Sequence, residues 1–144
     1  MQASSKYTKA IQICMYMNFH KDELISSARL AESLSTNPVV VRRLMKELRD
    51  AEVVKSIAGT QGGFQLNKDA KDISLWDIYL LMREEDFFQR PKVNPDCIIS
   101  SNLKALVHDT FTEAELSMKS SLSSKNIEDL TIELREIVDS PVVS

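Results

Sequence analysis

Cysteine and glycine are scarce in this sequence of 144 residues, which contains two cysteines and three glycines. The cysteines, Cys14 and Cys97, lie far apart and show neither the spacing of a zinc site nor the framework of a disulfide-rich domain. A chain of this length buries enough apolar surface to fold without such cross-links. The composition therefore argues against a small disulfide-stapled scaffold and predicts reduced thiols.

Long apolar segments are also missing. No apolar run approaches the roughly 18 residues that a transmembrane helix needs, and the N-terminal residues MQASSKYTK lack the apolar stretch of a signal peptide. We expect a cytoplasmic protein without a membrane partner. The sequence also offers no nucleophile–base pair, phosphate-binding loop or metal-binding set, so we expect no enzyme, no catalytic residues, no metal and no cofactor.

The charge is unevenly distributed along the chain. Residues 1–66 hold nine Lys and Arg against six Asp and Glu, a balance of +3, whereas residues 67–144 have a balance of −6. Such an asymmetry is typical of a basic binding half joined to an acidic half. Chance surface composition is the alternative, because the whole protein carries a net charge of −3.

The segment 26–48, SSARLAESLSTNPVVVRRLMKEL, predicts a short helix, a three-residue turn and a longer helix. Ser26 or Ser27 can cap the first helix, and Thr36 or Asn37 the second. Pro38 fits the first turn of the second helix, because its missing N–H would have no intrahelical partner there.

The longer helix has two different faces on a helical wheel. Its apolar face holds Val41, Leu44, Met45 and Leu48. Its opposite face holds Val39, Arg42, Arg43 and Lys46. A cationic face of this kind suits the major groove of DNA, although a solvated helix surface would look the same.

All three glycines, Gly59, Gly62 and Gly63, lie between the short extended runs VVKSI and FQL. They permit the backbone angles of a tight β-hairpin. Two helices joined by a three-residue turn and followed by a glycine-rich hairpin have the order of a winged helix-turn-helix, whose second helix enters the major groove. This combination favours a DNA-binding protein with double-stranded DNA as its partner.

Four further helices complete the expected fold, which is mainly α with a small β-hairpin wing. We expect them over residues 5–19, from Ser74 to near residue 83, over residues 100–122, and from Asn126 onward. The last helix is expected to bury Ile127, Leu130, Leu134, Ile137 and Val138. The expected organisation is a DNA-binding domain at 1–83, a linker or sensor loop at 84–99, and a dimerisation helix with a short packing helix at 100–144.

The helix at 100–122 carries a narrow apolar stripe, close to the seam of a coiled coil. It consists of Leu103, Leu106, Val107, Thr110, Ala114 and Met118, with Phe111 beside it. Ala114 would let a second helix approach closely. The stripe predicts a homodimer interface.

The arrangement SSARLAESLSTNPVVVRRLMKELRDAEVV, GTQGGFQL and ISLWDIYLLM resembles the Rrf-two (Rrf2) family of bacterial transcriptional regulators. In that family two chains pair through the long helix, the recognition helices enter successive major grooves, and the wing reaches the minor groove. The resemblance implies a homodimeric repressor on a palindromic operator. It implicates Lys6, Tyr7, Ser27, Thr36, Asn37, Val39, Arg42, Arg43, Lys46, Thr60 and Gln61 in DNA binding, with Tyr7 equally suited to the core.

Cluster-binding members of that family carry three closely spaced cysteines before the long helix, where this chain has only Cys97. A cluster needs about four ligands, and neighbouring serines are poor ligands for iron. The sequence therefore resembles the cluster-free branch. Cys97 is a candidate sensor thiol, or else a small residue that packs near the dimer axis; the effector stays unknown. The alternative function is a winged-helix adaptor that binds proteins and not an operator.

Overall fold

The computed structural model describes residues 2–89 and 92–140. Its elements are α1 (Gln2–Phe19), α2 (Ser27–Ser33), α3 (Pro38–Asp50), β1 (Val54–Ile57), β2 (Gly63–Leu66), the 3₁₀ helix η1 (Ala70–Asp72), α4 (Leu75–Met82), α5 (Ile98–Ser123) and α6 (Ile127–Asp139). The two strands pair antiparallel. The predicted fold class, mainly helical with a small hairpin, is confirmed. None of the helices described is both long and apolar enough to span a membrane.

Short polar side chains determine where the helices begin. Ser26 accepts a backbone N–H bond at the start of α2, and Asn37 does the same for α3, with Pro38 as the first helical residue. α4 and α6 each begin with a reciprocal capping box, in which two side chains bond each other's backbone N–H. The pairs are Ser74 with Asp77 and Asn126 with Asp129.

One hydrophobic core joins the helices of the N-terminal part. Ile13 on α1, Leu30 on α2 and Leu48 on α3 are fully buried in it. Ile78 on α4 and Ile127 on α6 belong to the same core. The first residue of α6 therefore packs with the DNA-binding half of the chain, although the sequence groups α6 with the long helix.

A buried polar contact holds α6 on α1. The Asn18 amide donates to the Thr131 hydroxyl at 2.9 Å, and this hydroxyl donates to the Ile127 carbonyl at 2.8 Å. Asn18 and Thr131 are almost completely buried. Because buried polar groups are costly without partners, this pair favours one docking position for α6. Neither residue stands out in the sequence alone.

The prediction for the buried face of α6 was partly wrong. Ile127 is buried and Leu130 and Leu134 are half-buried, but Ile137 and Val138 are exposed near the end of the helix. α6 packs on α1 and η1, and Arg135 donates to the Phe19 carbonyl at the end of α1; Ile137 and Val138 follow this contact, near the end of α6.

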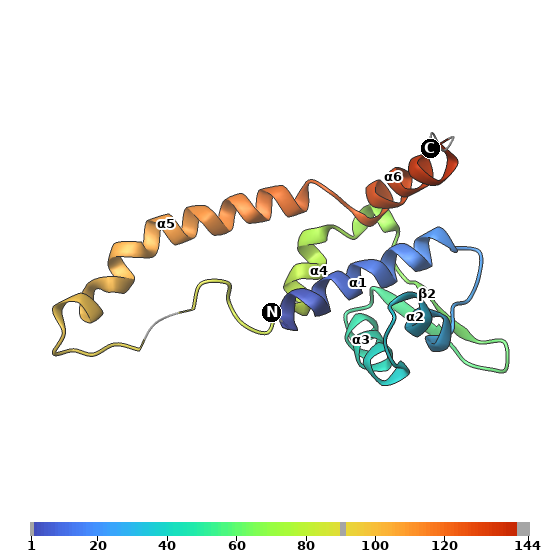
Figure 1. Cartoon of the computed structure of the whole chain (residues 1–144), viewed down its shortest axis with the longest axis horizontal. Helices are drawn as coiled ribbons and strands as arrows, with labels where there is room; N and C mark the ends of the chain where they lie inside the picture. The colour runs from blue at the N-terminus through green and yellow to red at the C-terminus, as the bar shows by residue number, and fades with distance from the viewer. Residues whose placement is uncertain (1, 90–91, 141–144) are drawn as a thin grey trace.

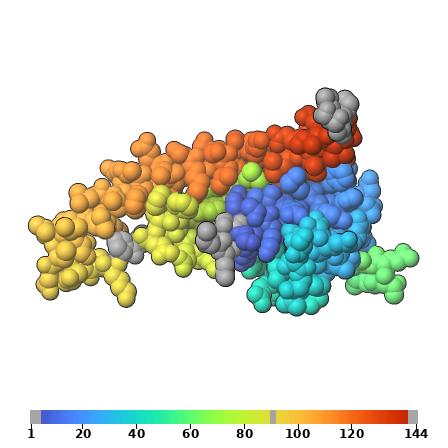
Figure 2. All heavy atoms as spheres, in the orientation of Figure 1, coloured from blue at the N-terminus to red at the C-terminus, as the bar shows by residue number. Residues whose placement is uncertain are grey.

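The linker and α5 form an arm that leaves the core and returns to it. Figure 1 shows the chain running away from α4, turning, and coming back along α5 to α6. α5 begins at Ile98, two residues before the predicted start, and none of its residues is buried. The space-filling view shows its N-terminal half projecting beyond the body of the molecule (Figure 2).

Candidate DNA-binding interface

The recognition helix α3 presents its cationic face to solvent. Its buried residues are Val41, Leu44, Met45 and Leu48, as the wheel predicts. Val39 is 54% exposed, and Arg42, Arg43 and Lys46 are exposed beside it. The apolar face therefore fixes the helix against α1 and α2 and leaves the cations free to approach a partner.

The cations of α3 differ in their contacts within the chain. Lys46 pairs with Asp50 at 3.1 Å, but both side chains are mostly exposed, so this pair is weak. Neither Arg42 nor Arg43 forms an ion pair with a residue of the described ranges. The positive charges of Arg42 and Arg43 are therefore available to bind a polyanion.

The turn before α3 is set by local backbone bonds. Ser35 adopts a left-handed conformation with φ of 50°, and the Thr36 N–H donates to the Ala31 carbonyl at 3.0 Å. Asn37 is exposed and uses its side-chain oxygen as the cap of α3, while Thr36 and Ser27 are half-buried. The turn thus places Asn37 and Val39 at the leading end of the recognition helix.

The hairpin is anchored at its base and exposed at its tip. The strand β2 continues its pairing to Ile25, with Ile25 N–H to Phe64 O at 2.9 Å and the reverse bond at 2.8 Å. A Cβ atom on Gly63 would lie 2.9 Å from the Ile25 carbonyl oxygen, so this close approach requires glycine. Thr60 and Gln61 are exposed at the turn. Figure 1 shows the hairpin and α3 on one side of α1, with α5 on the other.

Lys6 and Tyr7 turn toward the protein. The Lys6 ammonium lies 2.8 Å from Glu47 on α3 and 3.8 Å from Glu84, just after α4. The Tyr7 hydroxyl donates to the Leu75 carbonyl at 2.6 Å, and desolvation raises the pKa of this phenol. Contacts to DNA from Lys6 and Tyr7 stay predictions, whereas these intramolecular contacts are present. Sequence reasoning missed the Lys6–Glu47 pair because nothing local links residues so far apart in the chain.

The predicted dimer stripe of α5 lies partly in solvent and partly against its own chain. Leu106 is 74% exposed, and Thr110 and Ala114 are exposed on the same face. Leu103, Val107 and Met118 are half-buried. Phe111 stacks on Phe88 of the linker with ring centroids 4.2 Å apart, so it packs within the chain.

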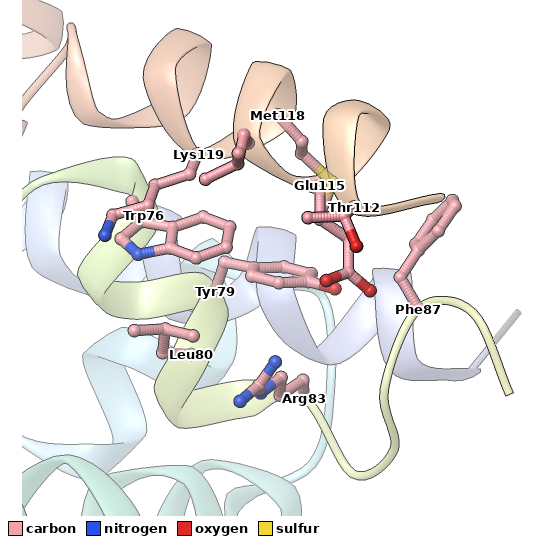
Figure 3. A pocket seen from close by; sticks show the side chains of 10 residues that line it. Trp76, Tyr79, Leu80, Arg83, Phe87, Thr112, Glu115, Met118 and Lys119 are labelled. Atoms are coloured by element: carbon pink, nitrogen blue, oxygen red, sulfur yellow. The ribbon is translucent and has the colours of Figure 1, made fainter. Parts of the chain in front are cut away.

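The inner face of α5 borders a shallow groove along α4. Trp76 and Tyr79 of α4 stack with ring centroids 5.2 Å apart. Figure 3 shows Glu115 and Lys119 reaching from α5 toward these rings, with Met118 at the upper edge. Since α4 covers this side of α5 in the same chain, the uncovered side is the one with Leu106 and Ala114.

Cys97 occupies the N-cap position of α5. Its sulfur accepts a weak bond from the Ser100 N–H at 3.5 Å, and the side chain is half-buried. The predicted start of the helix at Ser100 placed Cys97 in the loop, so its capping role is visible only in the structure. Cys14 lies completely buried on α1, and this burial raises the pKa of its thiol to about 12.

Comparisons with known proteins agree with this geometry. A family model, Rrf2, described as an iron-dependent transcriptional regulator, matches residues 3–133. YwnA of Bacillus subtilis (strain 168), whose name assigns it to the HTH-type transcriptional regulators, is 35% identical over 129 residues, which are 88% of this chain and 95% of YwnA.

Solved structures show the same fold. A crystal structure from Lactobacillus plantarum, described as a transcriptional regulator, superposes with a TM-score of 0.74 at 26% identity, covering 90% of this chain and 89% of the other. The oxidized form of CymR from Staphylococcus aureus superposes with a TM-score of 0.67 at 22% identity, covering 91% and 96%. At that identity the second match speaks for the fold alone.

The family match over residues 3–133 includes the helix-turn-helix, the wing and the arm. The family consists of DNA-binding regulators of transcription and not of enzymes, in agreement with the prediction from the sequence. The chain therefore belongs to the Rrf2 family of transcriptional regulators.

Proposed function

We propose that this regulator is a homodimeric repressor that binds a palindromic operator. The observation that carries the proposal is the exposed cationic face of α3 next to the exposed wing tip, on the side of the molecule away from α5. Arginine can bond two acceptors on the major-groove edge of guanine, and lysine neutralises phosphates. Repression requires nothing beyond occupation of a promoter by the bound dimer.

The exposed arm is the second observation in favour of a homodimer. α5 has no buried residue over its 26 positions, and large apolar side chains such as Ile99 and Leu106 are about 70% exposed. A contiguous apolar surface of this kind usually marks an interface. Pairing of two arms would place the two recognition helices at a fixed separation, and a palindromic site needs about 34 Å between half-sites.

A selection experiment tests the proposal. The full-length protein is incubated with a pool of random duplexes, bound DNA is enriched, and the selected sequence is measured against a scrambled duplex over a range of salt concentrations. We expect a palindromic consensus, strong preference over the scrambled duplex, and affinity that falls steeply with salt. A protein–protein adaptor would enrich no sequence, and that outcome would favour the alternative function.

The thiol of Cys97 is proposed as the sensor of this regulator. Cys97 begins the dimer helix, so a modified sulfur would lose the capping bond to Ser100 and disturb the start of the arm. A signal shifts an equilibrium only if it discriminates between two states, and a different position of the arm after modification of Cys97 would be such a second state.

We expect mild peroxide or a thiol alkylator to change operator affinity by more than about threefold, or roughly 0.7 kcal/mol. The Cys97→Ser variant should not respond, and the buried Cys14 should stay unmodified because its raised pKa keeps the thiol protonated. Mass spectrometry of the treated protein locates the modified residue. An equal response of wild type and Cys97→Ser would make Cys97 a structural residue.

The residues of this chain do not fit an iron–sulfur cluster, although the family model is described as iron-dependent. A cluster needs about four ligands, mainly thiolates. The sequence holds only Cys97 near the arm, and Cys14 is enclosed in the core. No group of three or more His, Cys, Asp or Glu side chains within the described residues has a metal-binding arrangement.

The purified protein is therefore expected to be colourless and to contain iron well below one equivalent per chain when prepared without oxygen. Iron and acid-labile sulfide analysis checks this expectation. Stoichiometric amounts of both would show that ligands from outside the chain complete a cluster.

A further inference from the structure

The N-terminal part of α1 carries two lysines with different surroundings. Lys6 lies between two carboxylates, Glu47 on α3 and Glu84 after α4, and 22% of its side chain is exposed. Lys9, one turn later, forms no ion pair with any residue in the described part of the chain. Lys6 is therefore held by intramolecular ion pairs, whereas Lys9 is available to bind a partner.

Lys6 compensates a carboxylate that is partly enclosed. Glu47 receives the Lys6 bond on Oε1, while its Oε2 is buried without a hydrogen-bond partner. Removing the ammonium would leave this carboxylate with no partner on either oxygen, which is costly in a partly buried place. Engaging Lys6 with a DNA phosphate would have the same cost, so Lys6 is a poor candidate for that contact.

Lys9 and Arg43 line one hollow between α1 and α3. The hollow has a volume of about 280 Å³, and Ser5, Lys6, Val40, Leu44 and Glu84 form the rest of its lining. Arg43 stands on the exposed face of the recognition helix and lines the same hollow. Lys9 and Arg43 stand on two elements around one hollow, and neither forms an ion pair within residues 2–89 and 92–140. Such a pair of cations suits a single oxygen-rich anion.

We propose that Lys9 together with Arg43 binds one backbone phosphate of the DNA, and that Lys6 is a positioning residue that holds α3 on α1. This inference rests on the proposed DNA-binding function and assigns the phosphate contact of α1 to a residue other than the Lys6 that family resemblance implicates. Glu84, 71% exposed in its side chain, lies on the same hollow and opposes the anion. It would weaken contacts to any duplex, whatever its sequence.

Salt dependence separates a phosphate contact from a positioning role. Each neutralised phosphate contributes about 0.9 to the slope of log affinity against log salt, whatever the sequence. The probes are the selected operator and a scrambled duplex of the same length, each measured with the full-length protein. Wild type, Lys9→Met, Lys6→Met, Glu47→Gln, the Lys6→Met/Glu47→Gln double variant and Glu84→Gln are compared.

We expect Lys9→Met to reduce the slope on both duplexes by about 0.9 without changing the melting temperature. Lys6→Met should lower the melting temperature and operator affinity but keep the wild-type slope. The double variant should regain much of the lost melting temperature, because it removes the uncompensated carboxylate as well. Glu84→Gln should raise affinity for the scrambled duplex severalfold.

A reduced slope in Lys6→Met, or an unchanged slope in Lys9→Met, would overturn the assignment. If Lys6→Met does not fold, the salt slope of the Lys6→Met/Glu47→Gln variant tests whether Lys6 contacts a phosphate, because that variant also lacks the Lys6 ammonium. Failure of the wild type to prefer the selected operator would instead count against the proposed function. The experiment therefore distinguishes failure of the proposed function from a wrong assignment of the phosphate contact to Lys9.

Discussion

The double variant Leu106→Asp/Ala114→Asp is expected to be a monomer at micromolar concentration and to bind the operator at least about a hundredfold more weakly than the wild type, since linked half-site binding is worth 10²–10⁴ in affinity. Leu106 and Ala114 are exposed on α5, and neither lines the groove between α5 and α4. Aspartates there would place like charges opposite each other in a symmetric seam. Light scattering and operator titration measure both effects.

A matched control is available on the same helix. Ala105→Asp/Leu116→Asp introduces the same two substitutions at exposed positions, but roughly 130° around α5 from the first pair on average at 100° per residue. We expect this variant to stay dimeric and to bind DNA. If the first variant remains a dimer, or if both variants dissociate equally, the interface lies elsewhere.

Arg43→Ala and Lys46→Ala are each expected to reduce operator affinity without unfolding the protein. Loss of a base contact should cost about 1–3 kcal/mol, or roughly fivefold to 150-fold, whereas loss of a phosphate contact should lower the salt slope by about one unit. The side chains face away from the buried stripe, and the exposed Lys46–Asp50 pair contributes little to stability. Thermal unfolding and binding titrations therefore separate the two properties.

Lys71→Ala is the control for this series, because Lys71 is an exposed lysine on η1, outside the recognition helix and the wing. Its removal changes the net charge by the same amount and should leave the affinity nearly unchanged. If Arg43→Ala and Lys46→Ala both keep the operator affinity and the salt slope of the wild type, α3 is not part of the DNA interface.

Much of the N-terminal half was predictable because its signals are local. The adjacent residues Asn37 and Pro38 mark the start of α3, and the spacing of Val41, Leu44 and Leu48 assigns its buried face. The glycines around Thr60 likewise predict the wing. Caps, helical periodicity and turn residues act over one or two turns of chain, so a single sequence contains them in full.

Contacts between distant segments were not predictable in the same way. Whether Lys6 faces DNA or Glu47, and whether Asn18 has a buried partner in Thr131, depends on how α1, α3 and α6 pack. The surroundings of α5 were also not predictable. Phe111, beside the apolar stripe, stacks on Phe88 of the linker in the same chain.

The sequence by itself determined the order of the elements, the candidate caps of α2, α3, α4 and α6, and the residues on the exposed face of the recognition helix. The tertiary structure alone decided which lysine of α1 is held by carboxylates, which turns of α6 are covered, and which face of α5 remains open to a second chain. The physical reason is range: backbone capping and periodicity are set by neighbours in the chain, whereas burial and ion pairing depend on which surfaces meet after the chain has folded.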